Sequence, residues 1–548
     1  MKDNILKKVV AALVPLLLAA CADQTAYQGN ESPVADKLPE SKLVADVVAV
    51  TGGLVRGSVR GEGLQEFLGI PYAAPPVGDL RWQPPAPVTA WEDEHDGAQF
   101  GMPCYQPGSL SAFYDRTYEE MSEDCLTLNV WTRAEKTSDA LPVMVWIHGG
   151  ALVMGSGIDY DGAPLTAKGV VLVTINYRLG PFGFYAHPEL SVEGGGSSGN
   201  QGFRDQIAAL TWVQENIEQF GGDPDNVTIF GESAGSWSMS VMQASPMARG
   251  LFSKVIGQSG ARFIPAPDLK VGRWGIPSAE DRGETLARLF SGVDTPDLEA
   301  LRELSASSIL AGYTADPAIL LNFDWLTIVD GEVLPDEVNT IFAEGRQADV
   351  PVMIGSNADE ATTFDPALSM VGPIDYVELH KQFVGATLGG DQAGIFALYP
   401  DSLEQARDSY IRFNTDANFT QPMRLWADYM GNVSSPAYLY WWDWRPVIDG
   451  SDQYGAFHAA EIPYVFGDLA MFNIEANARE TDFSETMMTI WSNFAKNGDP
   501  SSEGIIDWPA YAKDKPTTAV LGAEITLEDG VRSDQVQVIT TGYEARRN

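Results

Sequence analysis

The stretch Val227-Thr-Ile-Phe-Gly-Glu-Ser-Ala-Gly-Ser236 decides the fold of this chain. Its β-branched and aromatic residues from Val227 to Phe230 predict a buried strand. The strand is expected to stop at Gly231, where small residues lead into a helix-forming segment. A Gly-x-Ser-x-Gly pattern on so tight a turn requires a strained backbone at Ser233 and exposes its hydroxyl above the carboxyl edge of a sheet. The N–H of Ala234 is then expected to point toward any oxyanion formed at that serine.

A second match to the same pattern, Gly195-Gly-Ser-Ser-Gly199, serves as an internal comparison. No apolar strand precedes it, and its glycine and serine content predicts a loop. The context therefore selects Ser233 as the candidate nucleophile and not Ser197.

Apolar runs and amphipathic segments alternate along the chain. The expected strands are a hairpin within Val47–Val59, then Ser122–Trp131, Leu141–Ile147, Val170–Ile175, Lys254–Gln258, Pro351–Gly355 and Ala437–Trp444. The expected helices are Gly202–Phe220, Ala279–Leu289, Pro296–Leu310, Ser484–Asn497 and much of 365–432. Phe67–Trp82 shows no periodicity and is interpreted as an ordered loop. This alternation predicts an α/β fold with a large, mainly parallel sheet and helices on both faces. Residues 262–345 and 365–432 are interpreted as inserted cap regions.

A serine hydroxyl needs an adjacent base, which in turn needs an orienting acid. After a nucleophile turn of this kind, the acid and then the base follow the serine along the chain. That order leaves two of the five histidines. His380 lies in a helix-like segment and is expected to face solvent, whereas His458 lies on a loop beyond a strand. Catalytic groups of open α/β sheets sit on such loops, so His458 is the candidate base.

The acid should also follow a strand, and Pro351–Glu360 offers the adjacent carboxylates Asp359 and Glu360. Either carboxylate could accept the imidazole N–H, so the local pattern leaves both open. The loop His148-Gly-Gly-Ala151 follows another strand, and its glycines allow backbone N–H groups to face the reaction centre. Gly149 and Gly150, together with the N–H after the serine, are the expected oxyanion hole. His148 itself is expected to pack and hydrogen-bond rather than to act as a base.

The composition sets outer limits on the function. The 548 residues have a formal net charge of −40 and are 45% hydrophobic, which is ample for a packed core. Such an acidic chain repels polyanions, which argues strongly against nucleic acid or an anionic membrane surface as a binding partner. The histidines are too few and too scattered for a metal site of the usual spacing, and no cofactor is expected.

The N-terminus has the pattern of a targeting segment. Residues 1–20 combine lysines with a short apolar stretch, and residues 21–42 are polar and are interpreted as a tether. Leu18-Ala-Ala-Cys21 resembles the lipobox of bacterial lipoproteins, which implies lipidation of Cys21, export and anchoring to a membrane, with outer-membrane sorting expected. An ordinary secretory signal is the alternative. Cys104 and Cys125 would then remain as a pair in a compartment where a disulfide persists, with two free buried thiols as the alternative.

Taken together, the motifs resemble those of the type-B carboxylesterase and cholinesterase family of α/β-hydrolases. The matching segments are Phe67–Gly78, Ser122–Trp131, His148–Ala151, Asn176–Arg178, Gly199–Gln206, Gly231–Ser236, Asn357–Glu360 and His458–Gly467. The resemblance extends from about Val47 to Tyr511. It implies one α/β-hydrolase domain over 43–548, with a large mixed sheet, a small N-terminal sheet and helical cap insertions.

The resemblance also implies roles for individual residues. It assigns the triad acid to Glu360 and implies a Cys104–Cys125 disulfide at the border of the active-site gorge. It places Glu232 in the gorge and makes Ser259 a supporting hydroxyl. It further implies two buried ion pairs, Arg81–Glu123 and Arg178–Asp205. The family's glycine after the acid is Ala361 here, and Ala459-Ala460 follow the histidine; these departures concern pocket shape.

These observations predict a serine carboxylic-ester hydrolase that acts on small-molecule esters through an acyl-enzyme. A lipase, a thioesterase or a transacylase would use the same triad. A non-catalytic binding protein of the family is the remaining alternative, and the intact triad disfavours it. The sequence does not define the ester or the oligomeric state.

Overall fold

A computed structural model describes most of the chain. It covers residues 46–61, 63–108, 118–273, 275–315, 326–365, 374–388, 393–448 and 454–547. The chain groups into two compact units. The first unit contains Met1–Val145, Val153–Asp225 and Glu280–Leu326, and the second contains Trp146–Leu152, Asn226–Ala279 and Thr327–Asn548. The expected signal peptide, the tether and the lipidated Cys21 lie outside the described residues.

The first unit contains the small N-terminal sheet. Strands β1 (Val47–Val50) and β2 (Gly53–Arg56) pair antiparallel, which confirms the predicted hairpin, and β5 (His95–Asp96) pairs with β2. The strands that this unit contributes to the larger sheet lie in the order β3-β4-β6-β8-β7. Their bounds are Ser58–Arg60, Leu64–Pro71, Thr127–Thr132, Val171–Ile175 and Leu141–Ile147. The β3–β4, β4–β6 and β6–β8 pairs are antiparallel.

The interpretation of Phe67–Trp82 as a loop is wrong for its first part. Residues up to Pro71 belong to β4. The remaining residues form a loop that contains the short helix η1 (Gly78–Leu80). The register shifts between Phe67 and Ile70, and Gly69 has a φ of +65°. This irregularity removes the alternation by which a strand is recognised. The expected strand at Ser122–Trp131 likewise begins only at Thr127.

Helix α5 (Gln201–Asn216) continues into the 3-10 helix η5 (Ile217–Phe220), as its periodicity predicts. Its expected apolar face is buried, and Gly221 ends the helix with a φ of +76°. The other helices of this unit are α2 (Ala163–Thr166), α3 (Gly180–Gly183), α4 (Pro188–Glu193), α7 (Ala279–Ser291), α8 (Leu298–Arg302), α9 (Ala306–Thr314), η3 (Thr137–Asp139) and η4 (Gly157–Asp159).

The first unit also contains the cross-links that the family resemblance implies. Cys104 and Cys125 form a disulfide, so the alternative of two free thiols is wrong. Arg81 contacts both carboxylate oxygens of Glu123, at 2.5 and 2.7 Å. Arg178 contacts both carboxylate oxygens of Asp205, at 2.6 and 2.8 Å, and this second pair is fully buried. Such bidentate geometry offsets the cost of removing the charges from water.

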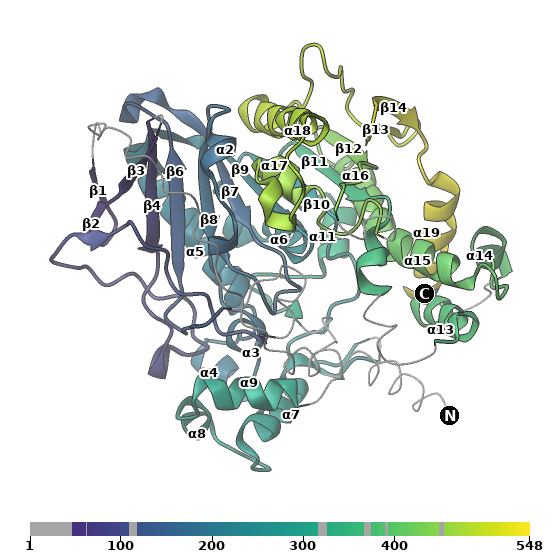
Figure 1. Ribbon diagram of the computed structural model, residues 1–548. Coiled ribbons are helices and arrows are strands. Elements are labelled where there is room, and N and C mark those ends of the chain that lie inside the picture. The colour runs from purple at the N-terminus through teal and green to yellow at the C-terminus, as the bar shows by residue number, and fades with distance from the viewer. Residues whose placement is uncertain are drawn as a thin grey trace, which may run out of the picture. The chain divides into compact units, whose positions relative to one another are not determined.

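The second unit holds the parallel part of the larger sheet. Its strands lie in the order β9-β10-β11-β12-β13-β14 (Figure 1), and only the last pair is antiparallel. Their bounds are Gly222–Glu232, Lys254–Gln258, Val352–Asn357, Ala437–Trp442, Thr517–Leu521 and Ile525–Asp529. Every residue of β10 and β11 is buried, as expected for parallel strands covered on both faces.

The register of these strands creates the edge at which the candidate site lies. Glu232 pairs with Gln258, and Gly355 pairs with Gln258 from the other side. The carboxyl ends of β9, β10 and β11 therefore meet at one edge of the sheet. Ligands and catalytic groups of open parallel sheets gather at this edge.

Helices α6 (Ala234–Ala244) and α16 (Gln421–Met430) pack against these strands, and α17 (Ile462–Phe466) packs against α18 (Ala478–Asn497), as Figure 1 shows. The mainly helical character expected for 365–432 is confirmed in its described parts. Its helices are α13 (Tyr376–Leu388), α14 (Ala393–Leu398), α15 (Ala406–Thr415) and the π-helix η9 (Asp416–Thr420). The remaining helices are η6 (Pro246–Ala248), α11 (Val338–Ala343), η8 (Glu360–Phe364), η11 (Leu469–Phe472) and α19 (Ser533–Arg547). The domain limit at 43–548 and the cap limits stay predictions.

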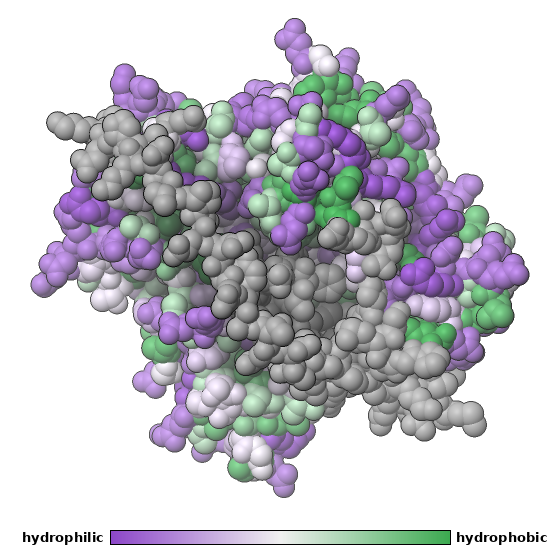
Figure 2. Space-filling model, in the orientation of Figure 1, coloured by the Kyte–Doolittle hydropathy of each residue, from purple (hydrophilic) through white to green (hydrophobic). Residues whose placement is uncertain are grey.

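Trp442 at the end of β12 and Trp444 just beyond it belong to the core. Trp442 is fully buried, and Trp444 stacks on Phe483 with 3.8 Å between ring centroids. On the face shown in Figure 2, hydrophilic residues cover most of the coloured surface and hydrophobic ones form separate patches. Among the described residues, no helix combines the length and the apolar character needed to cross a bilayer.

Candidate active site

Ser233 lies at the turn between β9 and α6, as the opening motif predicts. Its φ of +56° and ψ of −120° lie outside the regions that side-chain-bearing residues ordinarily occupy, a strain of about 1–3 kcal/mol. Two backbone hydrogen bonds hold the turn: the Ser233 N–H donates to Gln258 O at 2.8 Å, and the Trp237 N–H donates to Ser233 O at 2.9 Å. The Ser233 hydroxyl makes no hydrogen bond with any described residue.

The glycines of the motif allow the chain to pass close to β7. A Cβ atom on Gly231 would lie 2.6 Å from Ile147 O, and one on Gly235 would overlap the same oxygen. Ile147 is the last residue of β7, and the glycine loop at 148–151 follows it directly. The two glycines therefore let the nucleophile turn lie against this loop.

The glycine loop lies beside the serine. A Cβ on Gly149 would be 2.8 Å from Glu232 O and 3.2 Å from Ser233 Cβ, and Gly150 has a φ of +99°. Among the loop and turn hydrogen bonds of the described residues, none has its donor at Gly149, Gly150 or Ala234. These three N–H groups are the expected oxyanion donors. His148 is buried and faces Gly149 O at 2.8 Å; burial lowers its pKa to about 4.

Glu360 and His458 lie in direct contact, although 97 residues separate them in sequence. His458 Nδ1 donates to Glu360 Oε2 at 2.6 Å, and the N–H of Asn357 donates to Glu360 Oε1 at 2.7 Å. The carboxylate is fully buried. Both of its oxygens thus have partners, which orients the imidazole with Nε2 directed away from the acid.

His458 Nε2 faces Glu232. It lies 3.1 Å from Glu232 Oε1, within ion-pair distance but without hydrogen-bond geometry. Burial by itself lowers the pKa of His458, but the carboxylates of Glu232 and Glu360 outweigh this effect and raise it to about 9. Burial holds the pKa of Glu232 well above its ordinary value. The imidazole is therefore more basic than an isolated histidine.

Asp359 has a different partner from Glu360. Its carboxylate accepts a hydrogen bond from the Ala456 N–H at 2.9 Å, and its own N–H donates to Ala456 O at 2.9 Å. The structure thereby separates the two carboxylates that the local sequence pattern left open. Glu360 contacts the imidazole ring, and Asp359 holds the loop on which the histidine lies.

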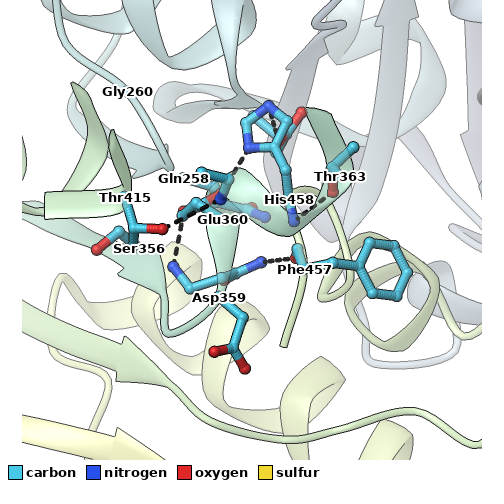
Figure 3. A network of polar contacts seen from close by, with 12 residues as sticks. Gln258, Gly260, Ser356, Asp359, Glu360, Thr363, Thr415, Phe457 and His458 are labelled. Atoms are coloured by element: carbon cyan, nitrogen blue, oxygen red, sulfur yellow. Dashed lines mark hydrogen bonds and ion pairs between the residues drawn. The ribbon is translucent and has the colours of Figure 1, made fainter. Parts of the chain in front are cut away.

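Other residues around Glu360 hold the same loop, as Figure 3 shows. Thr363 Oγ1 accepts from the His458 N–H at 3.1 Å, and Asn357 Nδ2 donates to Phe457 O at 2.8 Å. We name Asn357–Phe364 the acid turn. Its residues contact successive positions of the histidine loop, 454–458, so the two segments are held together by backbone as well as side-chain hydrogen bonds.

The comparisons with known proteins agree on one family. The carboxylesterase family model matches residues 44–539. The chain is 38% identical over 509 residues to the para-nitrobenzyl esterase of Bacillus subtilis (strain 168), covering 90% of this chain and 98% of that protein. It is 35% identical over 519 residues to the fumonisin B1 esterase of Sphingopyxis macrogoltabida, covering 91% of this chain and 90% of that protein.

The chain belongs to the carboxylesterase family. A solved structure of a PNB esterase matches this carboxylesterase with a TM-score of 0.77 and 36% identity, over 90% of this chain and 99% of the other. The structure of the Geobacillus stearothermophilus carboxylesterase Est55 matches with a TM-score of 0.77 and 31% identity, over 90% of this chain and 100% of the Est55 chain. The α/β-hydrolase fold and the activity of a serine carboxylic-ester hydrolase follow from these relationships.

Ser259, Ser197 and His380 of this carboxylesterase lie outside the contact between Glu360 and His458. Ser259 is buried with a φ of +57°, and its hydroxyl makes no hydrogen bond with a described residue. Ser197 lies in a loop, as predicted, and accepts a hydrogen bond from Arg204. The expectation that His380 faces solvent is wrong. His380 is fully buried, and its Nε2 faces Tyr399 O at 3.0 Å. It is buried because α13 packs against an apolar cluster that includes Val384 and Phe413.

Sequence reasoning did not find the aromatic neighbours of His458. The rings of Phe364 and Phe419 lie 5.5 and 4.8 Å from the imidazole, centroid to centroid, and their own planes differ by only 7°. Phe364 lies on the acid turn, and Phe419 lies on the π-helix η9. No motif marks either residue, because their proximity depends on how η9 packs. Among the described residues, no group of three or more His, Cys, Asp or Glu side chains is arranged to hold a metal ion.

The glycine loop generates the first test. Replacing Gly149 with Ala places a methyl group 2.8 Å from Glu232 O, so the loop must shift. Since losing one oxyanion donor lowers the rate about 10²–10³-fold, we expect a loss of ester hydrolysis of this order. Gly394→Ala is the control, because no atom lies within 4 Å of its Cβ position. Equal kcat values for the Gly149 and Gly394 variants would contradict the assignment.

Proposed function

We propose that this carboxylesterase cleaves small carboxylic esters through an acyl-enzyme on Ser233, with His458 as base and Glu360 as orienting acid. The observation that carries the proposal is the 2.6 Å contact between Glu360 and His458, next to a strained serine. An ester carbonyl above Ser233 would have its oxygen beside the N–H groups of Gly149, Gly150 and Ala234. These donors would stabilise the tetrahedral oxyanion.

The first half-reaction begins with the transfer of the serine proton. His458 Nε2 exchanges its contact with Glu232 for the Ser233 hydroxyl and accepts the proton as the oxygen attacks the ester carbon. Glu360 stabilises the imidazolium that forms. The imidazolium then donates the proton to the leaving alkoxide as the ester bond breaks. This leaves an acyl group on Ser233 and a free alcohol.

Water completes the cycle by the same route. His458 removes a proton from a water molecule, hydroxide attacks the acyl carbon, and Ser233 recovers its proton as the carboxylic acid leaves. An acceptor alcohol in place of water would make the protein a transacylase. A thioester substrate would make it a thioesterase. Both alternatives use the same residues, so the test must vary the substrate.

The test is hydrolysis of p-nitrophenyl esters from acetate to palmitate, together with a p-nitrobenzyl ester. We expect a short-chain optimum, and we expect Ser233→Ala to lower kcat/KM by about 10⁴-fold or more, because only binding and the oxyanion donors remain. Ser197→Ala is the matched control, since it alters the second Gly-x-Ser-x-Gly and should retain full activity. A long-chain optimum would favour a lipase. Activity that survives Ser233→Ala would overturn the proposal.

The pH dependence of kcat/KM tests the electrostatics of the base. His458 must be neutral to accept the proton, so with a pKa of about 9 we expect kcat/KM to rise with pH up to that value. Glu232→Gln removes a negative charge that raises this pKa, and the midpoint should move to lower pH by roughly one unit. Glu528→Gln, an exposed isosteric change, should leave the midpoint unchanged. An unchanged midpoint in the Glu232 variant would contradict this account.

We also propose that the enzyme is exported and anchored through a lipid on Cys21, on the basis of the lipobox-like Leu18–Cys21 segment. In a bacterial host, the wild-type protein should sediment with membranes and Cys21→Ser should not. Total ester hydrolysis should be the same for both. Equal partitioning of the two proteins into the soluble fraction would favour an ordinary secreted form.

A further inference from the structure

A π-helix lies beside the Glu360–His458 pair. Residues Asp416–Thr420 (η9) interrupt two consecutive α-helices, and the Gln421 N–H reaches back five residues to Asp416 O. A π-turn accommodates one extra residue per turn and is uncommon, but it occurs frequently at functional sites. Its side chains point in directions that a continuous α-helix would not provide.

Hydrogen bonds at the two ends of the π-helix connect it to the acid turn and to Ser356, the residue directly before that turn. Thr415, which precedes it, accepts a hydrogen bond at 3.1 Å from the N–H of Ala361, the residue after Glu360. Thr420, its last residue, accepts a longer hydrogen bond at 3.4 Å from the hydroxyl of Ser356. Figure 3 shows Thr415 and Ser356 on the same side of the acid turn.

Between these ends, Phe419 contacts His458. Its ring centroid lies 4.8 Å from that of the imidazole. The π-helix thus contacts the chain on either side of the acid and the ring of the base. A shift of η9 would move both members of the pair relative to each other.

The π-helix is also held by an ion pair between the buried carboxylate of Asp416 and the partly exposed Arg532. Asp416 is 1% exposed, and its carboxylate accepts hydrogen bonds from Tyr399 Oη at 2.6 Å and from Arg532 Nε at 3.0 Å. Arg532 Nη2 makes a further, shorter contact with the same carboxylate. Arg532 directly precedes the C-terminal helix α19. From the same helix, Tyr543 Oη donates to Ala417 O at 3.3 Å.

The burial of Asp416 makes this link strong. Removing Arg532 would leave the buried charge of Asp416 without its cation, which is unfavourable because the carboxylate is out of reach of water. Without Arg532, the segment can lower this cost by moving Asp416 toward water. That movement would alter the π-turn from which Thr420 and Phe419 project.

We propose that Arg532 and Asp416 are positioning residues, which hold Glu360 and His458 in their reactive arrangement through the π-helix. The inference rests on the proposed triad. It gives the C-terminal helix a role in the reaction, although no residue of that helix belongs to the triad. A displacement of about 1 Å at a reacting group can lower a rate about 10²-fold, so a modest change in η9 suffices.

The test is Arg532→Gln in the full-length enzyme, assayed with p-nitrophenyl acetate. We expect kcat to fall about 10- to 100-fold with KM within about twofold, because the substrate-binding surface is unchanged while the base is misplaced. The midpoint of the kcat/KM profile should move to lower pH by roughly half a unit. Three carboxylates, Glu232, Glu360 and Glu461, face the imidazole and raise its pKa. The π-helix contacts the turn that carries Glu360, so a displaced π-helix would weaken the effect of this carboxylate.

A matched control separates positioning from general destabilisation. Arg178→Gln also leaves a buried carboxylate unpaired, in the first unit, and should lower Tm without moving the pH midpoint. If Arg532→Gln does not fold, Asp416→Asn retains the shape and the hydrogen-bonding oxygen and should show a smaller shift in the same direction. Its effect should combine less than additively with that of Phe419→Leu, because both act on one segment.

Two outcomes would overturn the inference. One is an Arg532 variant that loses Tm but keeps the wild-type kcat and pH midpoint. The other is full additivity of Asp416→Asn with Phe419→Leu. Neither outcome would affect the proposed triad, which Ser233→Ala tests separately.

Discussion

The contact between the buried carboxylate of Glu360 and the imidazole of His458 constrains the rest of the second unit. A carboxylate removed from water loses several kcal/mol of hydration unless its oxygens find partners. The Asn357 N–H and His458 Nδ1 provide these partners. The chain must therefore bring a loop near residue 458 against a turn near residue 360, and the hydrogen bonds of Asp359 and Thr363 serve this purpose.

Two more buried carboxylates surround this contact. Glu232 ends β9, and Glu461 accepts hydrogen bonds from Gln258 Nε2 at 3.0 Å and from Asn357 Nδ2 at 2.7 Å. Burial raises the pKa of Glu461, as it does for Glu232. Their collective field favours the protonated imidazole. The same field that raises the pKa of His458 would therefore also stabilise the imidazolium in the proposed attack by Ser233.

The parallel strands make this concentration of charge possible. The carboxyl ends of β9, β10 and β11 meet at one edge, so residues from distant parts of the chain, such as Glu232, Gln258 and Asn357, become neighbours. Trp146 of β7, Phe230 of β9 and Phe466 of α17 form a fully buried aromatic cluster. The strained turn at Ser233 persists because the strands on either side hold it. The loop around Ser197 matches the same Gly-x-Ser-x-Gly pattern, but it lies between helices α4 and α5 and follows no strand.

Local patterns in the sequence determined most of the central strands, several main helices, the turn at Ser233 and the glycine loop, but not β13, β14 or α19. They did so because alternation, helical periodicity and glycine at close backbone approaches depend on neighbouring residues alone. Local patterns failed at β4, where a bulge hides the alternation, and at His380, whose burial depends on helices packing over it. They also left Asp359 and Glu360 equivalent, and only the family resemblance favoured Glu360.

Only the tertiary structure decided that His458 Nε2 faces Glu232 and that the π-helix beside the Glu360–His458 pair is tied to Arg532. Each of these depends on distances between segments that lie far apart in sequence. A pattern of residue types specifies which chemistry is available, whereas the position of a proton acceptor within a few tenths of an ångström depends on the packing of the whole sheet edge.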